Sequence, residues 1–366
     1  MRVSGVLFTA LLIASIGAAP LLAQADEARM KLLIEQILKG DEVESKEATQ
    51  RLADQVTATL AKSLGTIEYD KLTMPQAIRL KVALEAISSQ LRARTFRATL
   101  PTADRELFDR FEKEYPDLTV RLFHDSEFVR RTALEQIPLD PGGGAGIMIA
   151  ARIDDATEDV MDAAIELAGK FKDPVLTRRI AFIIRDYTNA IRGGYYDVGQ
   201  QDLARTIAIF VGEMVKVLIA HDAREHAATV AEVTAYFGRG KLWDEHETAE
   251  IIRALGAWDA PPVVDLLLGM LDDPRLADFR VPGPAQKISQ TVGDAALLAL
   301  LSVHKLKAED YGFVTDSERG MTGFPDDKSR IDARRAFRAW HEKNRPRAAS
   351  QPASATATQP KESSKP

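Results

Sequence analysis

Apolar residues recur at every fourth position in several stretches of the chain, which is the spacing of one face of an α-helix. The clearest stretch is 122–137, whose stripe consists of Val129, Ala133 and Ile137. The same skeleton returns in two downstream stripes, which are Val160, Ala164 and Ala168, and then Val292, Ala296 and Leu300. Helices that repeat in this way along a chain indicate stacked helical hairpins.

The polar residues near these stripes predict where each helix begins and which way it faces. Asp125 or Ser126 is expected to cap the first helix, because a short polar side chain there can accept a bond from a free N–H group. Arg130 and Arg131 are expected to point away from the apolar stripe. Asp155 is expected to cap the helix that carries the second stripe.

Comparable patterns predict further helices along the chain. We expect them over 26–39, 41–64, 73–96, 107–111, 174–192, 203–220, 222–237, 244–255 and 261–271. No stretch sustains a period-two alternation of β-branched residues, so no sheet is expected. The chain is therefore predicted to be all-α.

The repeated pattern resembles HEAT repeats, which often read Leu-x-Asp, a short polar stretch, and then Val-Arg-x-x-Ala-x-x-x-Leu. In that family the Asp and the Arg can bridge adjacent repeats as a ladder. The first copy has Arg130, but His124 stands at the Asp position; the second copy has Asp155, but Met161 stands at the Arg position. The resemblance implies an α-solenoid of degenerate HEAT-like helical hairpins, without predicting a continuous polar ladder.

The C-terminal part of the chain is rich in aromatic residues between short polar turns. Its order of Tyr-Gly-Phe, Gly-Phe, an acidic pair, Arg330 and a final Trp resembles the C-terminal end of secreted bacterial HEAT-repeat proteins. That resemblance supplies no catalytic residue. Because the last repeat of a solenoid must cover an apolar face, we predict an aromatic end cap made of Tyr311, Phe313, Phe324, Phe337 and Trp340.

The first 25 residues have the pattern of a cleavable secretory signal peptide. Arg2 precedes the uncharged apolar stretch 6–16, and the small-x-small sequence 23–25 precedes Asp26. We therefore expect cleavage after Ala25, a periplasmic or extracellular location, and no stable membrane span in the mature chain. The alternative is an uncleaved membrane anchor, for which the apolar segment is long enough.

Together these patterns divide the chain into five segments. They are a signal peptide (1–25), an N-terminal helical region (26–116), a HEAT-like repeat region (117–305), a C-terminal cap loop and helix (306–346) and a disordered Ser/Ala/Thr/Pro tail (347–366). The 366 residues include no cysteine, which excludes disulfides and thiol chemistry. A net charge of −6 argues against general binding of nucleic acid, which requires a basic face.

We predict no catalytic residue, no cofactor and no metal ligand. The nearest candidate is the acidic stretch 244–250, where His246 and Glu250 share one helical face. An acid-rich first turn that complements the helix dipole explains this cluster better, because a zinc site needs further ligands from elsewhere in the chain.

Two other features are better explained by structure than by function, and a third is open between the two. The glycine-rich stretch 141–146 lacks the residues of a phosphate-binding motif and is expected to be a turn between helices. Arg92, Arg94 and Arg97 suit the end of a helix and are expected to be neutralised by the acids that follow. The insertion 273–286 has even odds of being functional or a plain surface loop.

From these observations we expect a non-enzymatic interaction scaffold in the cell envelope that binds a protein or an envelope polymer on its solenoid surface. The alternative is a metal-dependent or lyase- or hydrolase-type enzyme, or an enzyme subunit, with a site near residues 244–250.

Overall fold

The chain is all-α in this computed structural model, as its sequence predicts. The residues described are 20–54, 64, 67–140, 142–194, 201–240, 242–277, 288–316 and 321–344. The predicted signal peptide therefore lies almost wholly outside them, and so does the predicted C-terminal tail. The chain forms two compact units, residues 1–243 and 244–366, and each is described by itself.

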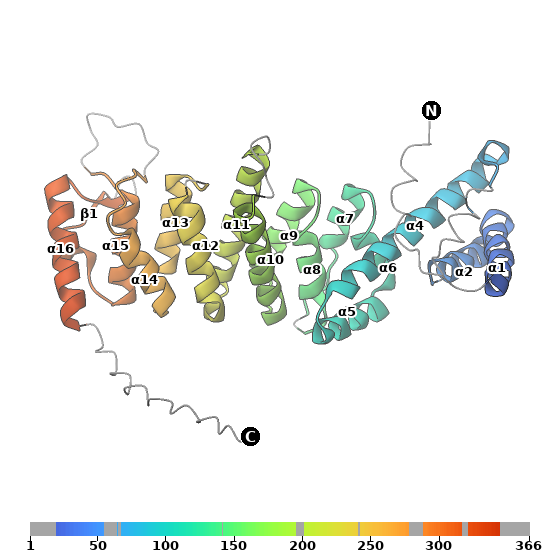
Figure 1. Ribbon diagram of the computed structural model, residues 1–366, viewed down its shortest axis with the longest axis horizontal. Coiled ribbons are helices and arrows are strands. Elements are labelled where there is room, and N and C mark those ends of the chain that lie inside the picture. The colour runs from blue at the N-terminus through green and yellow to red at the C-terminus, as the bar shows by residue number, and fades with distance from the viewer. Residues whose placement is uncertain are drawn as a thin grey trace, which may run out of the picture. The chain divides into compact units, whose positions relative to one another are not determined.

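The described part of the first unit consists of helices (Figure 1). They are α1 (Pro20–Lys39), α2 (Glu42–Asp54), η1 (Tyr69–Lys71), α4 (Met74–Thr99), α5 (Thr102–Glu114), α6 (Pro116–Leu122), α7 (Glu127–Leu134), α8 (Ala145–Ile153), α9 (Glu158–Lys170), α10 (Pro174–Arg192), α11 (Gln201–Ala220), η2 (Arg224–His226) and α12 (Ala227–Arg239). Among the described residues, no helix has both the length and the apolar character that are needed to cross a membrane.

Two helix starts in this unit show how the sequence sets the element boundaries. Thr73 precedes α4, and its backbone N–H donates to Oε1 of Gln76 at 3.0 Å, so the predicted start is confirmed. Asp173 caps α10, because its Oδ1 accepts the N–H groups of Val175 at 2.8 Å and Leu176 at 2.9 Å. Both caps satisfy backbone N–H groups at the start of a helix, which have no hydrogen-bond partner within the helix itself.

Helices α7 to α12 pack in two layers, with the helices of each hairpin in different layers. α8 and α9 contact one another, as do α10 and α11. One layer consists of α8, α10 and α12, and the other of α7, α9 and α11, with each helix contacting the next in its own layer (Figure 1). The stripe residues Val160, Ala164 and Ala168 are fully buried in this packing, as their spacing predicts.

The first stripe belongs to a shorter helix than the sequence predicts. The helix begins after Ser126, as predicted, but α7 ends at Leu134, so Ile137 lies beyond it. Before it, the chain turns between Leu122, where α6 ends, and Ser126. In that turn Nδ1 of His124 accepts the N–H of Ser126 at 3.0 Å, a local bond that competes with helix formation. Ser126 holds the predicted cap position, although its side chain makes no capping hydrogen bond.

Arg130 does not point away from the core, which corrects the prediction. Its side chain is 9% exposed and donates Nε to Oδ2 of Asp155 at 2.9 Å and Nη2 to Oδ1 at 2.8 Å. Asp155 is not a cap either, since Thr157 occupies that position before α9. Asp155 instead accepts hydrogen bonds from Arg130, Arg152 and Thr157. The pair therefore links α7 to the turn that precedes α9.

The second unit is built around a helix that is buried on nearly every side. Its elements are α13 (Glu245–Leu255), α14 (Pro261–Met270), α15 (Val292–Val303), η3 (Ala308–Tyr311), β1 (Val314–Asp316), β2 (Met321–Gly323) and α16 (Asp327–Asn344). α15 packs against both α13 and α14. The approach at the end of α13 is close, since a Cβ on Gly256 would lie 2.9 Å from Cα of Ala299. Only glycine fits at that contact.

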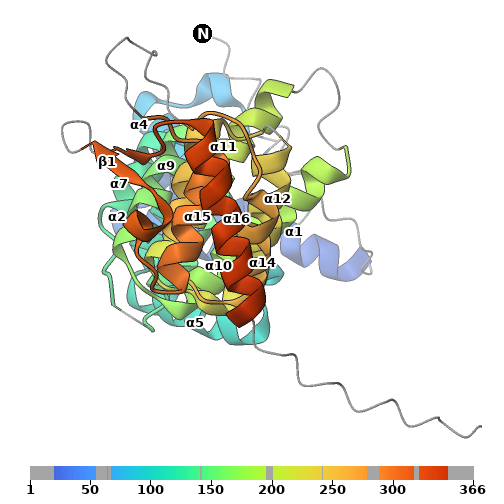
Figure 2. The same cartoon turned by 90° about the vertical axis from the view of Figure 1, so that its left-hand side faces the viewer.

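A buried carboxylate joins α15 to α16, which lie side by side in Figures 1 and 2. Asp294 is fully buried and accepts Nε of Arg330 at 2.8 Å, Nη2 of Arg334 at 2.8 Å and the backbone N–H of Thr291 at 2.9 Å. Phe324 and Phe337 are fully buried beside this network. The network explains why a strongly basic helix ends the described part of this unit.

The expectation that the chain has no sheet is wrong in one detail. β1 and β2 form a short antiparallel pair, with Val314 opposite Gly323 and Asp316 opposite Met321. Phe324, directly after β2, also exchanges two backbone hydrogen bonds with Ser289, at 2.9 and 3.0 Å. Strands of three residues are too short for an alternating pattern to reveal.

The adjacent residues Arg130 and Arg131 offer a matched test of this packing. Arg130→Ala should lower the free energy of unfolding by about 3 kcal/mol, because the buried carboxylate of Asp155 loses one of its two arginines. Arg152 remains as its charged partner. Arg131→Ala should change it by about 0.5 kcal/mol or less, since its ion pair with Asp159 is exposed and 4.0 Å long. Urea unfolding of both variants measures the difference, and equal midpoints would contradict it.

The same pair should show a pH dependence of known sign. Burial disfavours the charge on Asp155, but hydrogen bonds from Arg130 and Thr157 outweigh it and hold the pKa below the ordinary 3.8. A lowered pKa gives stability that is present above 3.8 and is lost as the pH falls through the folded value. The stability difference between the parent and Arg130→Ala should therefore shrink in acid.

Candidate functional site

The structure gives the acidic stretch 244–250 a capping role. Oδ1 of Asp244 accepts the backbone N–H of Glu247 at 2.8 Å at the start of α13. Within the described part of the chain, no three histidine or carboxylate side chains converge as metal ligands would. No observation in the structure therefore favours a metal site around His246 and Glu250.

The remaining candidates from the sequence take part in local packing. Arg97 pairs with Asp109 at 2.5 Å, as predicted. Arg92 instead pairs with Asp125, which lies further along the chain than the acids expected to neutralise it. Gly144 has a left-handed backbone (φ 93°) immediately before α8, so the glycine stretch is a turn there. Most of the insertion 273–286 lies outside the described residues.

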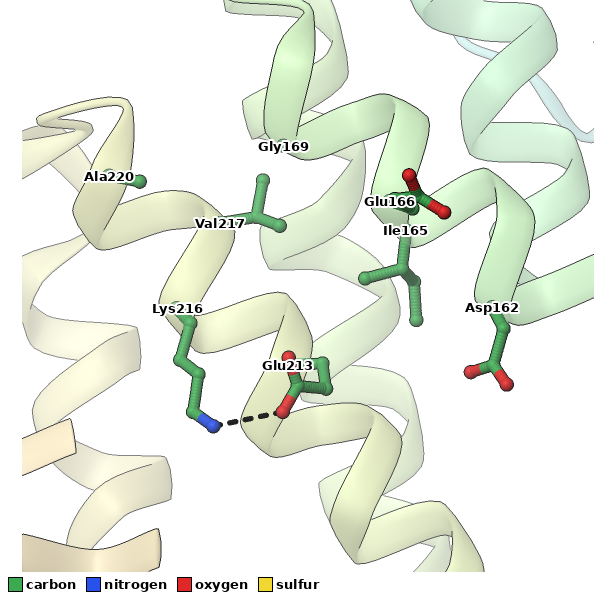
Figure 3. Close-up of a pocket in the computed structure, with 8 residues that line it drawn as sticks. All are labelled: Asp162, Ile165, Glu166, Gly169, Glu213, Lys216, Val217 and Ala220. Atoms are coloured by element: carbon green, nitrogen blue, oxygen red, sulfur yellow. Dashed lines mark hydrogen bonds and ion pairs between the residues drawn. The ribbon is translucent and has the colours of Figure 1, made fainter. Parts of the chain in front are cut away.

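The structure instead reveals a groove between α9 and α11, which run in the same direction (Figure 3). Its volume is about 500 Å³. The lining residues are Asp162, Ile165, Glu166 and Gly169 from α9, with Glu213, Lys216, Val217 and Ala220 from α11. We call this the α9–α11 groove.

The α9–α11 groove has an apolar floor and a charged rim. Ile165 and Val217 are each 7% exposed and lie between the two helices (Figure 3). Gly169 and Ala220 have little or no side chain, so the groove stays open at the ends of both helices. A Cβ added to Gly169 would meet only Cγ2 of Val217, at 3.9 Å, which is an ordinary contact.

A histidine directly after Ala220 connects the ends of the two helices. His221 is 6% exposed, and its Nε2 lies 3.2 Å from the carbonyl oxygen of Gly169. Because a carbonyl can only accept, Nε2 carries the hydrogen in this bond. His221 thus ties the end of α11 to the end of α9 and helps to fix the width of the groove.

Most of the charges around the groove are paired with one another. Lys216 pairs with Glu213 at 2.9 Å, as the dashed line in Figure 3 shows. Lys170 pairs with Glu166 at 2.5 Å, and Arg131 approaches Asp159 at 4.0 Å. A second, smaller hollow lined by Arg131, Asp159, Asp162, Ala163 and Glu166 adjoins the first, so the depression extends from α11 across α9 towards α7.

Asp162 differs from these acids because it has no ion pair among the described residues. It borders both hollows. Partial burial raises its pKa above the ordinary value of 3.8, and repulsion from Asp159 and Glu213 raises it further. A carboxylate that remains charged at neutral pH in such surroundings attracts a cation from outside the chain.

Sequence reasoning missed this groove, although one local signal was present. Glu213 and Lys216 interrupt an otherwise apolar helix at a spacing of three, which places them together on one face. Gly169 and Ala220 each lie in the last turn of their helix. The sequence does not reveal that α9 packs against α11. That packing brings the lining residues of the two helices together.

Comparisons with protein-family models, curated proteins and solved structures find no match to this chain. The function is therefore inferred from the chain's own geometry.

The surroundings of Asp162 predict how its charge affects stability. A raised pKa means that the folded chain holds the proton more tightly than the unfolded chain, so the charged form lowers stability at neutral pH. Asp162→Asn should therefore raise the thermal midpoint at pH 7, and the gain should vanish below pH 3.8, where the parent is protonated in both states. Asp186→Asn, at an exposed position on α10, is the control. An equal gain in thermal midpoint there would contradict a special role for the surroundings of Asp162.

Proposed function

We propose that this protein is a non-enzymatic interaction scaffold, exported to the cell envelope, that binds a protein or polymer partner in the α9–α11 groove. The open groove with its apolar floor carries this proposal. Solvent-facing grooves between helices are common binding sites, and this one is lined at its floor by the apolar residues Ile165 and Val217. Export is supported by the residue pattern of the first 25 positions alone.

We further propose that the helices belong to a HEAT-like α-solenoid. Two features support it. The layers formed by α7, α9, α11 and by α8, α10, α12 are the arrangement expected of stacked hairpins. The bridge from Arg130 to Asp155 joins successive hairpins as the Asp and Arg of HEAT ladders do. A scaffold of this type offers an extended surface and does not require a catalytic centre.

The aromatic end cap is the third part of the proposal. α16 is tethered to α15 through Arg330 and the fully buried Asp294. Phe313, Phe324 and Phe337 are buried in the same unit. Each covers apolar surface that a last helical repeat would otherwise expose to water.

Truncation tests the end cap. Deletion from Tyr311 onward should expose apolar surface, leave Asp294 without its arginines and cause aggregation, since one buried aromatic side chain is worth about 3–5 kcal/mol. Deletion of Ala348 to Pro366 alone is the control and should leave stability unchanged. Melting curves and the fluorescence of a hydrophobic dye separate the two cases. A monomeric longer deletion that melts like the parent would refute the cap.

Affinity capture from the native envelope tests the scaffold function. Gly169→Leu places a large side chain in the groove at a position where a Cβ has room, and it should abolish capture of the specific partner. Asn189→Leu adds the same side chain at an exposed position on α10 and should leave capture intact. Equal capture by both variants would refute the groove as the binding surface.

N-terminal sequencing of the native protein should begin at Asp26, and an intact Met1 would contradict cleavage.

A further inference from the structure

We infer that the α9–α11 groove receives a lysine or arginine side chain from a basic polypeptide segment of the partner. This inference rests on the proposed function and specifies the partner's chemistry. Two separate features of the groove, its apolar floor and its one uncompensated carboxylate, point to the same kind of side chain.

The floor selects for an aliphatic stem. Ile165 on α9 and Val217 on α11 line the groove from its two sides, so a side chain that enters between the helices contacts apolar surface. Lysine and arginine carry three or four methylene groups that pack on apolar surface while the charged end stays in water. A compact cation such as a metal ion has nothing to contribute to this part of the groove.

The carboxylate selects for the charge. Asp162 lies one helical turn before Ile165, so its side chain is about 5–6 Å from the floor along the same face of α9. That separation suits a stem on the floor and a cationic end at the carboxylate. Glu213, on the opposite wall, and Asp159 both raise the pKa of Asp162, so an arriving cation relieves the repulsion among three acids.

The same charges disfavour other occupants. An acidic peptide or an anionic envelope polymer would add a negative charge next to Asp162, which has no ion pair among the described residues. A neutral apolar segment could use the floor but would cover Asp162 without giving it a partner, and a desolvated, unpaired carboxylate is costly. A basic polypeptide satisfies both the floor and the rim.

The test uses the mature chain and a fluorescein-labelled peptide of serine and alanine that carries two arginines. Matched peptides carry glutamine, glutamate or 2,3-diaminopropionate, a short cation without the aliphatic stem, at those two positions. Fluorescence anisotropy measures binding at low and at moderate salt. The arginine peptide should bind most tightly and should weaken with salt, since the charges are exposed. The diaminopropionate peptide should bind more weakly than the arginine peptide.

Three protein variants locate the binding. Asp162→Asn should weaken the arginine peptide about two- to fivefold, the range of an exposed ion pair. Gly169→Leu should abolish binding by filling the groove, and Asp186→Asn on α10 should leave it unchanged. Circular dichroism and melting curves confirm that each variant is folded.

The remaining outcomes overturn the inference. The inference fails if the arginine peptide does not bind the parent protein, or if the glutamine or glutamate peptide binds as tightly as the arginine peptide. It also fails if Asp162→Asn binds the arginine peptide as tightly as the parent does. The envelope capture separates this failure from failure of the scaffold function. If Gly169→Leu loses the native partner while Asp162→Asn keeps it, the groove is a binding site for a partner of different chemistry.

Discussion

In each unit of this chain, a buried aspartate is neutralised by two arginines and joins neighbouring helices. Asp155 is held by Arg130 and Arg152, and Asp294 by Arg330 and Arg334. Removing a carboxylate from water costs several kcal/mol, and only well-placed partners recover that cost. Apolar stripes can slide against one another with modest loss, whereas a bidentate arginine fits its carboxylate in one position. The buried pairs therefore give the helical packing its register.

The α9–α11 groove, which we propose as the binding surface, depends on that packing. Arg130 joins α7 to the start of α9, and His221 joins the end of α11 to the end of α9. Both ends of α9 are thus fixed to neighbouring helices of the same layer. A groove whose walls are fixed at both ends keeps its shape before a partner arrives, which reduces the entropy lost on binding.

In the first unit, the pKa of a buried aspartate and that of an aspartate beside the groove are shifted in opposite directions. Asp155 is buried and its hydrogen bonds lower its pKa, so its charge stabilises the fold. Asp162, only a helical turn or two away, has a raised pKa and no ion pair among the described residues. A charge that the fold tolerates without neutralising it is typical of binding surfaces, where the missing partner comes from another molecule.

The sequence by itself determined the helical content, the buried stripes and the starts of α4 and α10, because these depend on periodicity and on short-range hydrogen bonds. It placed Arg130 on the outside, since its own helix does not reveal that Asp155, 25 residues later, faces it. It gave no sign of the α9–α11 groove, whose residues lie up to 58 positions apart, from Asp162 to Ala220. Contacts of that kind exist only once α9 and α11 have packed side by side, so the tertiary structure alone decided where the open, charged surface lies.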